Sequence, residues 1–463
     1  AGYGPGLTVF YIYRIYWLAL GVVLYALAVL FYRRGVAYSV KQRLERFQKN
    51  LSSSYKVVIG LGLLVFIGIG SWIYYNDNIL NDMYTGNERE QLRVDYENQY
   101  AHLKDLDQPR ITGVSVDLDL YPKERNLKAK GEYILKNKTQ YPIDSVVVSL
   151  NDYKQSYSFD REGKVVLKDS LYDLEILRFE QALRPGEEVK FSFEMENEPN
   201  TVLNSNSPVR TNGTFINNRI FPSFGYNDSY EIQNNKTRKK YGLEPKERMM
   251  SPYDSTALGN TYISDDADWI DFETTISTSK DQIAVAPGYL QDQWTEGDRA
   301  YFHYKMDKKI LNFYAFNSAE YEVYEDQWKD VKLQVFYHKP HDYNIERMVN
   351  SAKKSLAYYS EQFSPYQFKQ LRILEFPLTS GTFAQSFANT VPYSEAIGFI
   401  AKVDEEDDES VDYPFSVTSH EVAHQWWAHQ AIGANRRGAT LLSEGMSEYS
   451  SLKVLEKEYG AAQ

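Results

Sequence analysis

The sequence predicts a multidomain membrane protein with two transmembrane helices, an all-β domain and the start of a mixed α/β domain. Three observations predict this fold class. Two uncharged apolar segments lie near the N-terminus, apolar residues alternate with polar ones from residue 111, and a helical period begins at residue 344. A chain of 463 residues is long enough for two or three domains with buried cores.

Each apolar segment is long enough to cross a bilayer as a helix. Residues 16–32 and residues 57–75 contain no charged side chain. A transmembrane helix needs roughly 20 apolar residues to cross ~30 Å of hydrocarbon. A signal peptide and a buried core helix are the alternatives for a single segment. The first segment has neither a basic region before it nor a small-residue cleavage site after it. We therefore predict a transmembrane hairpin over residues 1–76.

The loop within this hairpin, residues 33–56, has seven Lys or Arg residues and one Glu. The positive-inside rule predicts that the loop is cytoplasmic, that residues 76–463 are extracytoplasmic, and that the protein is a multi-pass protein of the cell (inner) membrane. Because the whole chain has a net charge of −12 and residues 1–56 have +7, residues 57–463 carry −19. An acidic ectodomain argues against nucleic acid as a partner. The chain has no cysteine, which excludes disulfides.

Residues 77–110 are polar, acidic and rich in helix formers, and we predict a helical stalk or surface helix that Pro109 ends. Residues 111–325 are predicted to form the β domain, an antiparallel sandwich or a saddle-like sheet, because many short strands are separated by polar turns. The strand candidates are residues 114–120, 145–150, 189–195, 272–277 and 300–324. Residues 200–265, rich in Asn, Ser, Lys and Pro, are predicted to form long loops.

Residues 326–463 are predicted to form the mixed α/β domain. Strand patterns occur at residues 331–337 and 371–376, and apolar residues follow a helical period over residues 344–363. The acidic run 404–409 is interpreted as a solvated loop. The chain stops within a helical pattern at Gln463, so we expect this domain to be truncated at its C-terminus.

The sequence His420-Glu421-Val422-Ala423-His424 has the form H-E-x-x-H. Two histidines four positions apart lie on one face of a helix, where both imidazoles can reach one zinc ion. Glu421 lies between them and is placed to take a proton from a zinc-bound water. The candidate N-cap residues of this helix are Ser416, Thr418 and Ser419, and residues 421–430 contain neither Pro nor Gly.

Glu444 on a following helix would complete three protein ligands and leave one position open, which is typical of a single catalytic zinc. Glu448, one turn later, is the alternative third ligand. The competing interpretation is a solvated helix with two surface histidines. Trp426 and Trp427 argue against it because they indicate a buried side, and His429 is interpreted as an ordinary polar residue.

These motifs carry a family resemblance. HEVAHQWWAHQ (420–430) and LLSEGMSEYSS (441–451) resemble the zinc-ligand segments of aminopeptidase N-like gluzincin metallopeptidases. Three longer stretches resemble a bacterial subgroup in which this peptidase module is fused to an ABC-transporter permease. These stretches are residues 108–133, 387–400 and 424–460, and the likeness extends over nearly the whole chain.

The resemblance implies a β domain followed by a thermolysin-like catalytic domain. It implies zinc ligands at His420, His424 and Glu444 and a general base at Glu421. In the family eighteen residues separate the second histidine from the glutamate. Here there are nineteen, and we expect the extra residue in the loop from Gly433 to Gly438.

The family also carries a Gly-Ala-Met-Glu-Asn segment whose glutamate binds the free amino group of the substrate. The matching residues are 383–387, which places Ala384, Gln385 and Ser386 at the substrate. Ser386 replaces the glutamate, and a hydroxyl does not pair with an ammonium as a carboxylate does. Strict aminopeptidase activity is therefore not expected, although the backbone could still bind a peptide as an added strand. The family's oxyanion-stabilising tyrosine would lie beyond Gln463.

Two functions follow from these patterns. The favoured one is a membrane-anchored zinc metallopeptidase that hydrolyses peptides outside the cytoplasm. By resemblance it belongs to an ABC-type transporter permease and has an ABC ATPase subunit as a partner. The alternative is a non-catalytic ectodomain of a transport complex that binds peptides or proteins. A third reading treats the two membrane helices as a bare anchor.

Overall fold

The computed structural model describes residues 7–32, 39–80, 84–197, 199, 207–264, 266–404, 406 and 410–460. The chain divides into two compact units, residues 1–89 with 199–206, and residues 90–198 with 207–463. The first basic residues of the predicted loop, Arg33 and Arg34, and most of the acidic run 404–409 lie outside the described residues.

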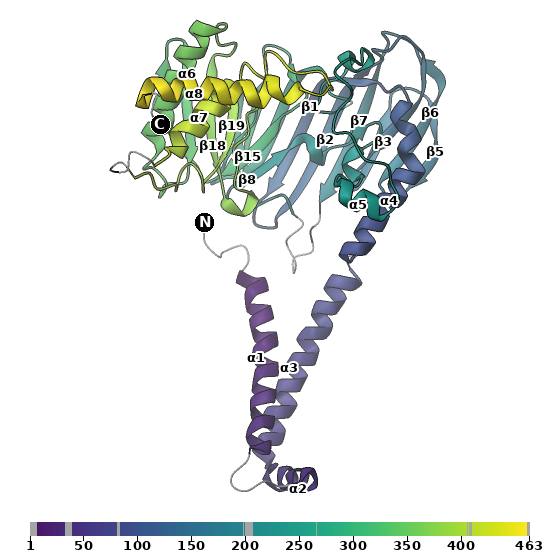
Figure 1. The fold of residues 1–463 in the computed structure, drawn as a ribbon, viewed down its shortest axis with the longest axis vertical. Coiled ribbons are helices and arrows are strands. Elements are labelled where there is room, and N and C mark those ends of the chain that lie inside the picture. The colour runs from purple at the N-terminus through teal and green to yellow at the C-terminus, as the bar shows by residue number, and fades with distance from the viewer. Residues whose placement is uncertain are drawn as a thin grey trace. The chain divides into compact units, whose positions relative to one another are not determined.

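The first unit contains the two apolar helices, α1 (Leu7–Phe31) and α3 (Ser53–Asn78), which lie side by side (Figure 1). Each is long and apolar enough to cross a membrane. Small residues bring the two helices close together, because a Cβ at Gly62 would meet a methyl group of Val23 at 2.6 Å. The Tyr16 and Phe66 rings stack with their centroids 4.4 Å apart.

The predicted basic loop contains a helix that the sequence analysis did not predict, α2 (Val40–Asn50). Ser39 caps its start through a capping box with Gln42, which satisfies two backbone N–H groups. The Phe47 ring stacks on Phe31 at the end of α1, with centroids 4.6 Å apart.

The second unit begins with an eight-stranded sheet in the order β12-β13-β10-β1-β2-β7-β4, with β14 paired to β10. Its strands are β1 (Arg110–Tyr121), β2 (Asn126–Lys136), β4 (Lys154–Phe159), β7 (Glu188–Asn197), β10 (Trp269–Ser279), β12 (Tyr289–Glu296), β13 (Arg299–Lys305) and β14 (Ile310–Leu311). The strands predicted at residues 114–120, 189–195 and 272–277 are confirmed. β1 and β10 run parallel, so the sheet is mixed and not purely antiparallel as predicted.

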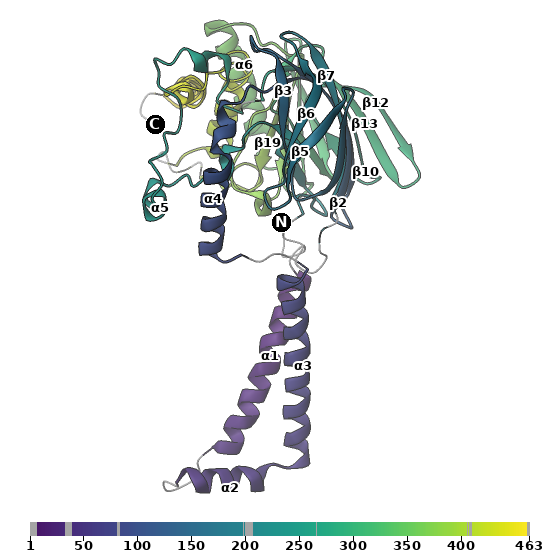
Figure 2. The same cartoon turned by 90° about the vertical axis from the view of Figure 1, so that its right-hand side faces the viewer.

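A second sheet, in the order β5-β6-β3-β9, packs against the large one (Figure 2). Its strands are β3 (Ile143–Ser149), β5 (Gly163–Asp169), β6 (Leu174–Leu183) and β9 (Ser223–Phe224), and a small sheet is formed by β8 (Thr214–Asn217), β11 (Ile283–Val285) and β15 (Ala315–Ala319). Leu118 and Phe191 of the large sheet share one buried cluster with Val146 and Phe179 of the second sheet. The two sheets therefore form a sandwich with its core between them.

The range 77–110, predicted as a stalk or surface helix, contains α4 (Gly86–Tyr100). Tyr96 and Tyr100 of α4 are buried in a cluster with Val147, Tyr172 and Tyr226 of the β domain. The C-terminal half of α4 is thus a surface helix that packs on the β domain.

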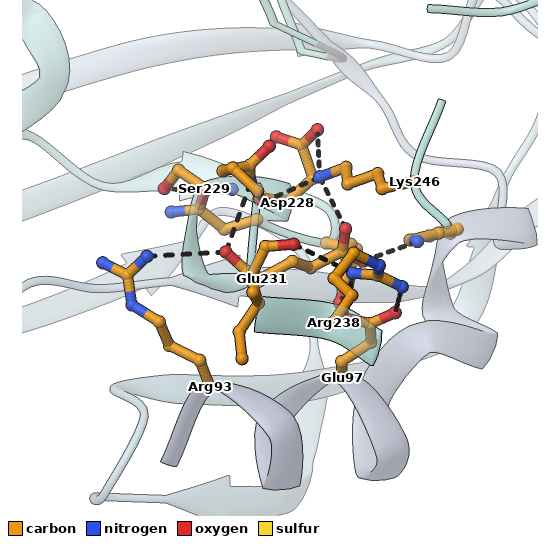
Figure 3. Close-up of polar contacts among 12 residues, drawn as sticks. Arg93, Glu97, Asp228, Ser229, Glu231, Arg238 and Lys246 are labelled. Atoms are coloured by element: carbon orange, nitrogen blue, oxygen red, sulfur yellow. Dashed lines mark hydrogen bonds and ion pairs between the residues drawn. The ribbon is translucent and has the colours of Figure 1, made fainter. Parts of the chain in front are cut away.

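Buried charges fix α4 to the segment that contains α5 (Asn235–Lys240) (Figure 3). Glu97 of α4 accepts two hydrogen bonds from the guanidinium of Arg238, at 2.6 and 2.8 Å. Both side chains are largely buried, with 12% and 5% exposed. Nearby, the fully buried carboxylate of Glu231 is neutralised by Lys246 at 2.5 Å and accepts a hydrogen bond from Tyr226.

Replacing Glu97 with Gln should destabilise the second unit by about 3 kcal/mol, because the substitution leaves the buried Arg238 guanidinium without its counter-ion. Urea unfolding of the purified protein, followed by circular dichroism, measures this change. The matched control is Glu90→Gln, whose exposed pair with Lys240 is screened by water and should change stability little. Equal effects of the two substitutions would contradict the prediction.

The remaining part is a four-stranded sheet in the order β16-β17-β18-β19, packed against helices (Figure 1). The elements are β16 (Glu322–Trp328), β17 (Val331–Tyr337), α6 (Ile345–Gln362), β18 (Gln370–Phe376), β19 (Thr390–Ser394), α7 (Tyr413–Ala423) and α8 (Met446–Tyr459). β17, β18 and β19 run parallel, while β16 is antiparallel to β17. The strands at 331–337 and 371–376 and the helix over 344–363 are confirmed as predicted.

Candidate metal centre

The H-E-x-x-H residues lie at the C-terminal end of α7, which begins further upstream than the sequence analysis expected. The N-cap is Asp412, whose carboxylate accepts a hydrogen bond from the Phe415 amide at 2.9 Å. The predicted N-cap residues, Ser416, Thr418 and Ser419, all lie inside the helix. The α-helix ends at Ala423, and residues 424–430 continue as hydrogen-bonded turns.

Three side chains bring one donor atom each to a common point. The Nε2 atoms of His420 and His424 are 3.1 Å apart, and Glu444 Oε2 lies 3.4 and 3.5 Å from them. Ligands at ~2.0–2.1 Å from a tetrahedral zinc are separated by about 3.3–3.4 Å, from the geometry of a tetrahedron. The three donors therefore have the spacing of three corners of a zinc tetrahedron, and the imidazole and carboxylate donor set suits this ion.

The outer ring nitrogens of both histidines are held by acceptors. His420 Nδ1 lies 2.9 Å from Glu448 Oε2, and His424 Nδ1 lies 3.3 Å from the Trp427 carbonyl oxygen and 3.0 Å from Ser447 Oγ. A carboxylate and a carbonyl only accept, which assigns the proton of each ring to Nδ1. Both Nε2 lone pairs are then free to bind a metal. Glu448, the alternative third ligand, contacts the outer nitrogen of His420, while Glu444 faces both Nε2 atoms.

The chemistry of Glu421 differs from that of Glu444. Burial raises the pKa of Glu421, although both neighbouring histidines and a backbone hydrogen bond at Ser386 oppose this shift. Hydrogen bonds from His420 and then His424 hold the pKa of Glu444 far below its usual range. Glu444 is thus kept ionised toward the histidines, whereas the raised pKa of Glu421 makes its ionised carboxylate a stronger base.

Glu444 lies in a π-helical turn, η7 (Leu441–Gly445), directly before α8. A π-helical turn contains an additional residue compared with an α-helical turn, and such turns occur frequently at functional sites. The sequence analysis expected the extra residue between His424 and Glu444 in the Gly433–Gly438 loop. The π-helical turn provides a second place for it, at the candidate ligand itself.

The segment predicted to contact substrate lies beside β19. Gln385 donates its backbone N–H to the Pro392 carbonyl at 3.0 Å, and Ala384 forms a bridge with Tyr393. Ser386 is 6% exposed, and its hydroxyl accepts a hydrogen bond from Gln425 Nε2 at 2.6 Å. The segment therefore forms an irregular strand at the β19 side of the sheet.

Two residues of the turn after α7 hold this segment, and the sequence analysis missed both roles. Gln425 Nε2 also donates to the Phe387 carbonyl at 2.8 Å, and Gln425 Oε1 accepts from the Asn389 amide at 2.9 Å. His429, interpreted as an ordinary polar residue, is 3% exposed, and its Nε2 lies 3.1 Å from the Ser386 carbonyl. Burial lowers the pKa of His429 to about 4, so the ring is neutral and donates to this carbonyl. The signal available in the sequence was the position of Gln425 and His429 within the motif HEVAHQWWAHQ.

The loop between α7 and α8 pairs with the β domain. Asn435 donates its N–H to the Asn260 carbonyl at 2.8 Å, and Arg437 donates to the Met250 carbonyl at 2.9 Å. Tyr262 donates its hydroxyl to Ser443 Oγ, next to Glu444, at 2.7 Å. Backbone pairing from residues 250–262 thus supports the position of the third donor.

The site is partly open. The side chains of His420 and His424 are mostly buried, whereas that of Glu444 is 62% exposed. A solvated helix with two surface histidines does not fit this burial.

Solved structures with the same fold are known. The chain aligns over 76% of its length with 72% of an M1 zinc metallopeptidase from Deinococcus radiodurans, a glutamate-to-alanine variant, at 14% identity and a TM-score of 0.50. A two-domain M1 zinc metallopeptidase variant bound to L-tryptophan matches over the same shares at 15% identity, also with a TM-score of 0.50. The chain shares the M1 metallopeptidase fold. No protein-family model and no curated protein matches it.

At this level of identity the likeness concerns the fold. The domain boundaries expected from the sequence stay a prediction. The fusion to an ABC permease also stays a prediction from the sequence.

Proposed function

We propose that this protein is a zinc metallopeptidase that hydrolyses peptides. His420, His424 and Glu444 hold one zinc ion, and Glu421 is the general base. The observation that carries the proposal is the spacing of three donor atoms at 3.1, 3.4 and 3.5 Å, with both histidines protonated on their outer nitrogens. The M1 fold supports the assignment because the neighbours are zinc metallopeptidases.

The bound zinc ion supplies a Lewis acid that polarises the scissile carbonyl and favours deprotonation of water near neutral pH. Glu421 accepts the proton of the attacking water and returns it to the leaving amine. The burial of Glu421 supports both steps. A raised pKa makes the carboxylate a stronger base, and the protonated carboxyl group can then donate its proton to the leaving amine. Glu448, Ser447 and the Trp427 carbonyl hold the two imidazoles in orientation.

The segment around Ala384 is proposed to bind the substrate backbone as an added strand. Phe383, Gln385 and Phe387 direct backbone groups toward β19, so residues 384 and 386 direct theirs to the opposite side. The Ser386 carbonyl is bonded to His429, which leaves Ala384 as the backbone contact we assign to the peptide. The Ser386 hydroxyl faces Gln425 and supplies no carboxylate for a substrate ammonium.

Hydrolysis of peptides with free and acetylated N-termini tests this specificity. We expect similar kcat/KM for the two forms of one peptide, because no carboxylate at residue 386 binds the amino group. A strict aminopeptidase would cleave the acetylated form at least about tenfold more slowly, the factor for losing one charge-assisted hydrogen bond. A large preference for free N-termini would contradict the assignment.

The alternative is a non-catalytic ectodomain that binds peptides or proteins. The replacement of the family glutamate by Ser386 favours it, whereas the buried general base beside the donor triad favours catalysis. If the protein bound zinc and peptides but hydrolysed none of a broad panel of peptides, the result would support the non-catalytic alternative.

We further propose that α1 and α3 span the cell membrane, with residues 33–56 cytoplasmic and residues 76–463 extracytoplasmic. The length and apolar character of both helices and the basic charge between them support this topology. α2 carries Val40, Leu44 and Phe47 among basic residues, a composition suited to an anionic membrane surface. By resemblance, the hairpin is part of an ABC-type permease that binds an ATPase subunit.

The absence of cysteine makes the topology testable. A single cysteine at Lys49 should resist a membrane-impermeant maleimide in intact cells, and one at the exposed Lys164 should react. Labelling of both positions, or of neither, would overturn the proposed orientation.

A further inference from the structure

A second group of metal-binding side chains lies at the carboxyl ends of three neighbouring parallel strands. His338 directly follows β17, Glu375 is the penultimate residue of β18, and Glu395 directly follows β19. His341 lies one turn after His338 and donates its N–H to the His338 carbonyl at 2.7 Å. The carboxyl edge of parallel strands is where α/β sheets commonly bind ligands. None of these residues belongs to the H-E-x-x-H site.

The donor atoms of this group converge. His338, His341 and Glu375 each offer a donor atom, and the three atoms lie within 4.8 Å of one another. His338 Nδ1 is 3.2 Å from Glu375 Oε1, close to the separation of two zinc ligands. His341 Nδ1 is hydrogen-bonded to the same oxygen, a position that a bound metal ion would take over from the proton. Glu395 Oε2 lies 4.0 Å from His341 Nδ1 and is the fourth donor within reach.

Hydrogen bonds fix both carboxylates and leave one oxygen of each directed at the histidines. Glu375 Oε2 accepts the backbone N–H of His338 at 2.6 Å, and Glu395 Oε1 accepts the backbone N–H of Leu378 at 2.8 Å. The second oxygens are those that face the imidazoles. Anchoring of this kind orients carboxylate ligands in metal sites.

The protonation of His338 provides the strongest argument. Its Nε2 lies 3.3 Å from Asn212 Oδ1, an atom that already accepts the Glu320 amide and is therefore an oxygen. The ring proton is then on Nε2, and Nδ1 presents a lone pair. This buried Nδ1 has no hydrogen-bond partner among the described residues, although a carboxylate oxygen lies 3.2 Å away. Two electron-rich atoms face each other at that distance only if a proton or a metal cation lies between them.

The charge balance points the same way. The carboxylates of Glu375 and Glu395 are 0% and 2% exposed. Among the described residues the ion-pair partners of Glu375 are His338 and His341, which carry charge only when protonated, and no Lys or Arg pairs with it. A buried carboxylate without a counter-charge is strongly unfavourable. A divalent cation bound by the two imidazoles and the Glu375 carboxylate would compensate the charge of Glu375 without protonation of either histidine.

We propose that His338, His341, Glu375 and Glu395 form a second, structural metal site that binds zinc. Two nitrogen and two oxygen donors suit Zn²⁺, and four protein ligands leave no open position for chemistry. The ion would join the ends of β17, β18 and β19. Asn212 of the β domain, held against His338, connects the site to the neighbouring domain. The histidine side chains are 15% exposed, which gives a metal ion access.

Zinc content of the purified full chain, after dialysis against a weak chelator, tests the proposal. His424→Ala disables the first site, and this variant should retain about one equivalent of zinc if the second site exists. Adding His341→Ala should remove that equivalent, and His341→Cys in its place should restore it, since cysteine is also a zinc ligand. The matched control, His303→Ala, removes a partly buried histidine that pairs with Glu273 outside both sites and should retain the metal.

Three results would overturn the proposal. They are a His424→Ala chain without zinc, an unchanged zinc content after His341→Ala, and no recovery with His341→Cys in a chain that still unfolds cooperatively. Failure of the first site alone gives a different pattern, in which the unmodified chain and the His424→Ala chain both hold one equivalent.

Discussion

Replacing Glu421 with Gln should lower kcat for peptide hydrolysis by about 10²–10⁴-fold, the range that a general base typically contributes. Glutamine has nearly the shape of glutamate but does not accept the proton of the attacking water. Because Glu421 is not one of the three converging donors, the zinc content should stay unchanged. Steady-state kinetics with a fluorogenic peptide, together with metal analysis of the same sample, measure both quantities.

The matched control is Glu448→Gln. Glu448 contacts the outer nitrogen of His420, and loss of such a partner typically costs about 10–100-fold in metal affinity or activity. The two glutamates should therefore differ: one substitution affects turnover alone, and the other affects zinc affinity as well. Wild-type turnover by the Glu421→Gln protein would refute the assigned mechanism.

Replacing His424 with Ala should abolish both hydrolysis and zinc binding at the H-E-x-x-H site. The substitution removes one of three donors and leaves His420 and Glu444 as two partly exposed ligands. The affinity should fall by more than the roughly 10–100-fold expected for a lost hydrogen-bonding partner. Competition with a chromogenic chelator measures the affinity, and His303→Ala serves as the control.

The expected signature is joint loss of activity and of the zinc equivalent bound at the H-E-x-x-H site, with recovery of neither at modest zinc excess. A His424→Ala protein that binds zinc at this site with unchanged affinity would exclude His424 as a ligand. The same protein hydrolysing peptides without bound zinc would exclude a zinc mechanism.

The sequence predicted the secondary structure well wherever periodicity is local. Residues 331–337 form β17 as predicted, and the helical period over 344–363 matches α6 within one residue at each end. A local pattern determines which residues face the core. It does not determine which strands become neighbours, and the parallel pairing of β1 with β10 joins segments more than 150 residues apart.

The candidate site was predicted where a motif named its residues and missed where contacts are non-local. His420, His424 and Glu444 converge as the spacing indicated. The N-cap prediction was wrong because it relied on the hydroxyls of Ser416 and Ser419. Asp412, followed by Pro414 at the start of the helix, was the better signal. The interpretation of His429 was wrong because a sequence does not show that the Ser386 carbonyl lies within hydrogen-bond distance of its ring.

The sequence alone could not predict the proposed second metal site. His338 and His341 are close in the sequence, but the carboxylates come from two other strand ends. Only the parallel order of β17, β18 and β19 brings these residues together. No spacing rule connects them.

The pairing of residues 434–437 with residues 250–262 has a consequence for modularity. The α/β half depends on the preceding half, because backbone hydrogen bonds at Met250 and Asn260 support the loop between α7 and α8. A recombinant protein that began at residue 326 would lack these backbone hydrogen bonds. Any transfer of this α/β half between proteins would therefore have to include residues 250–262.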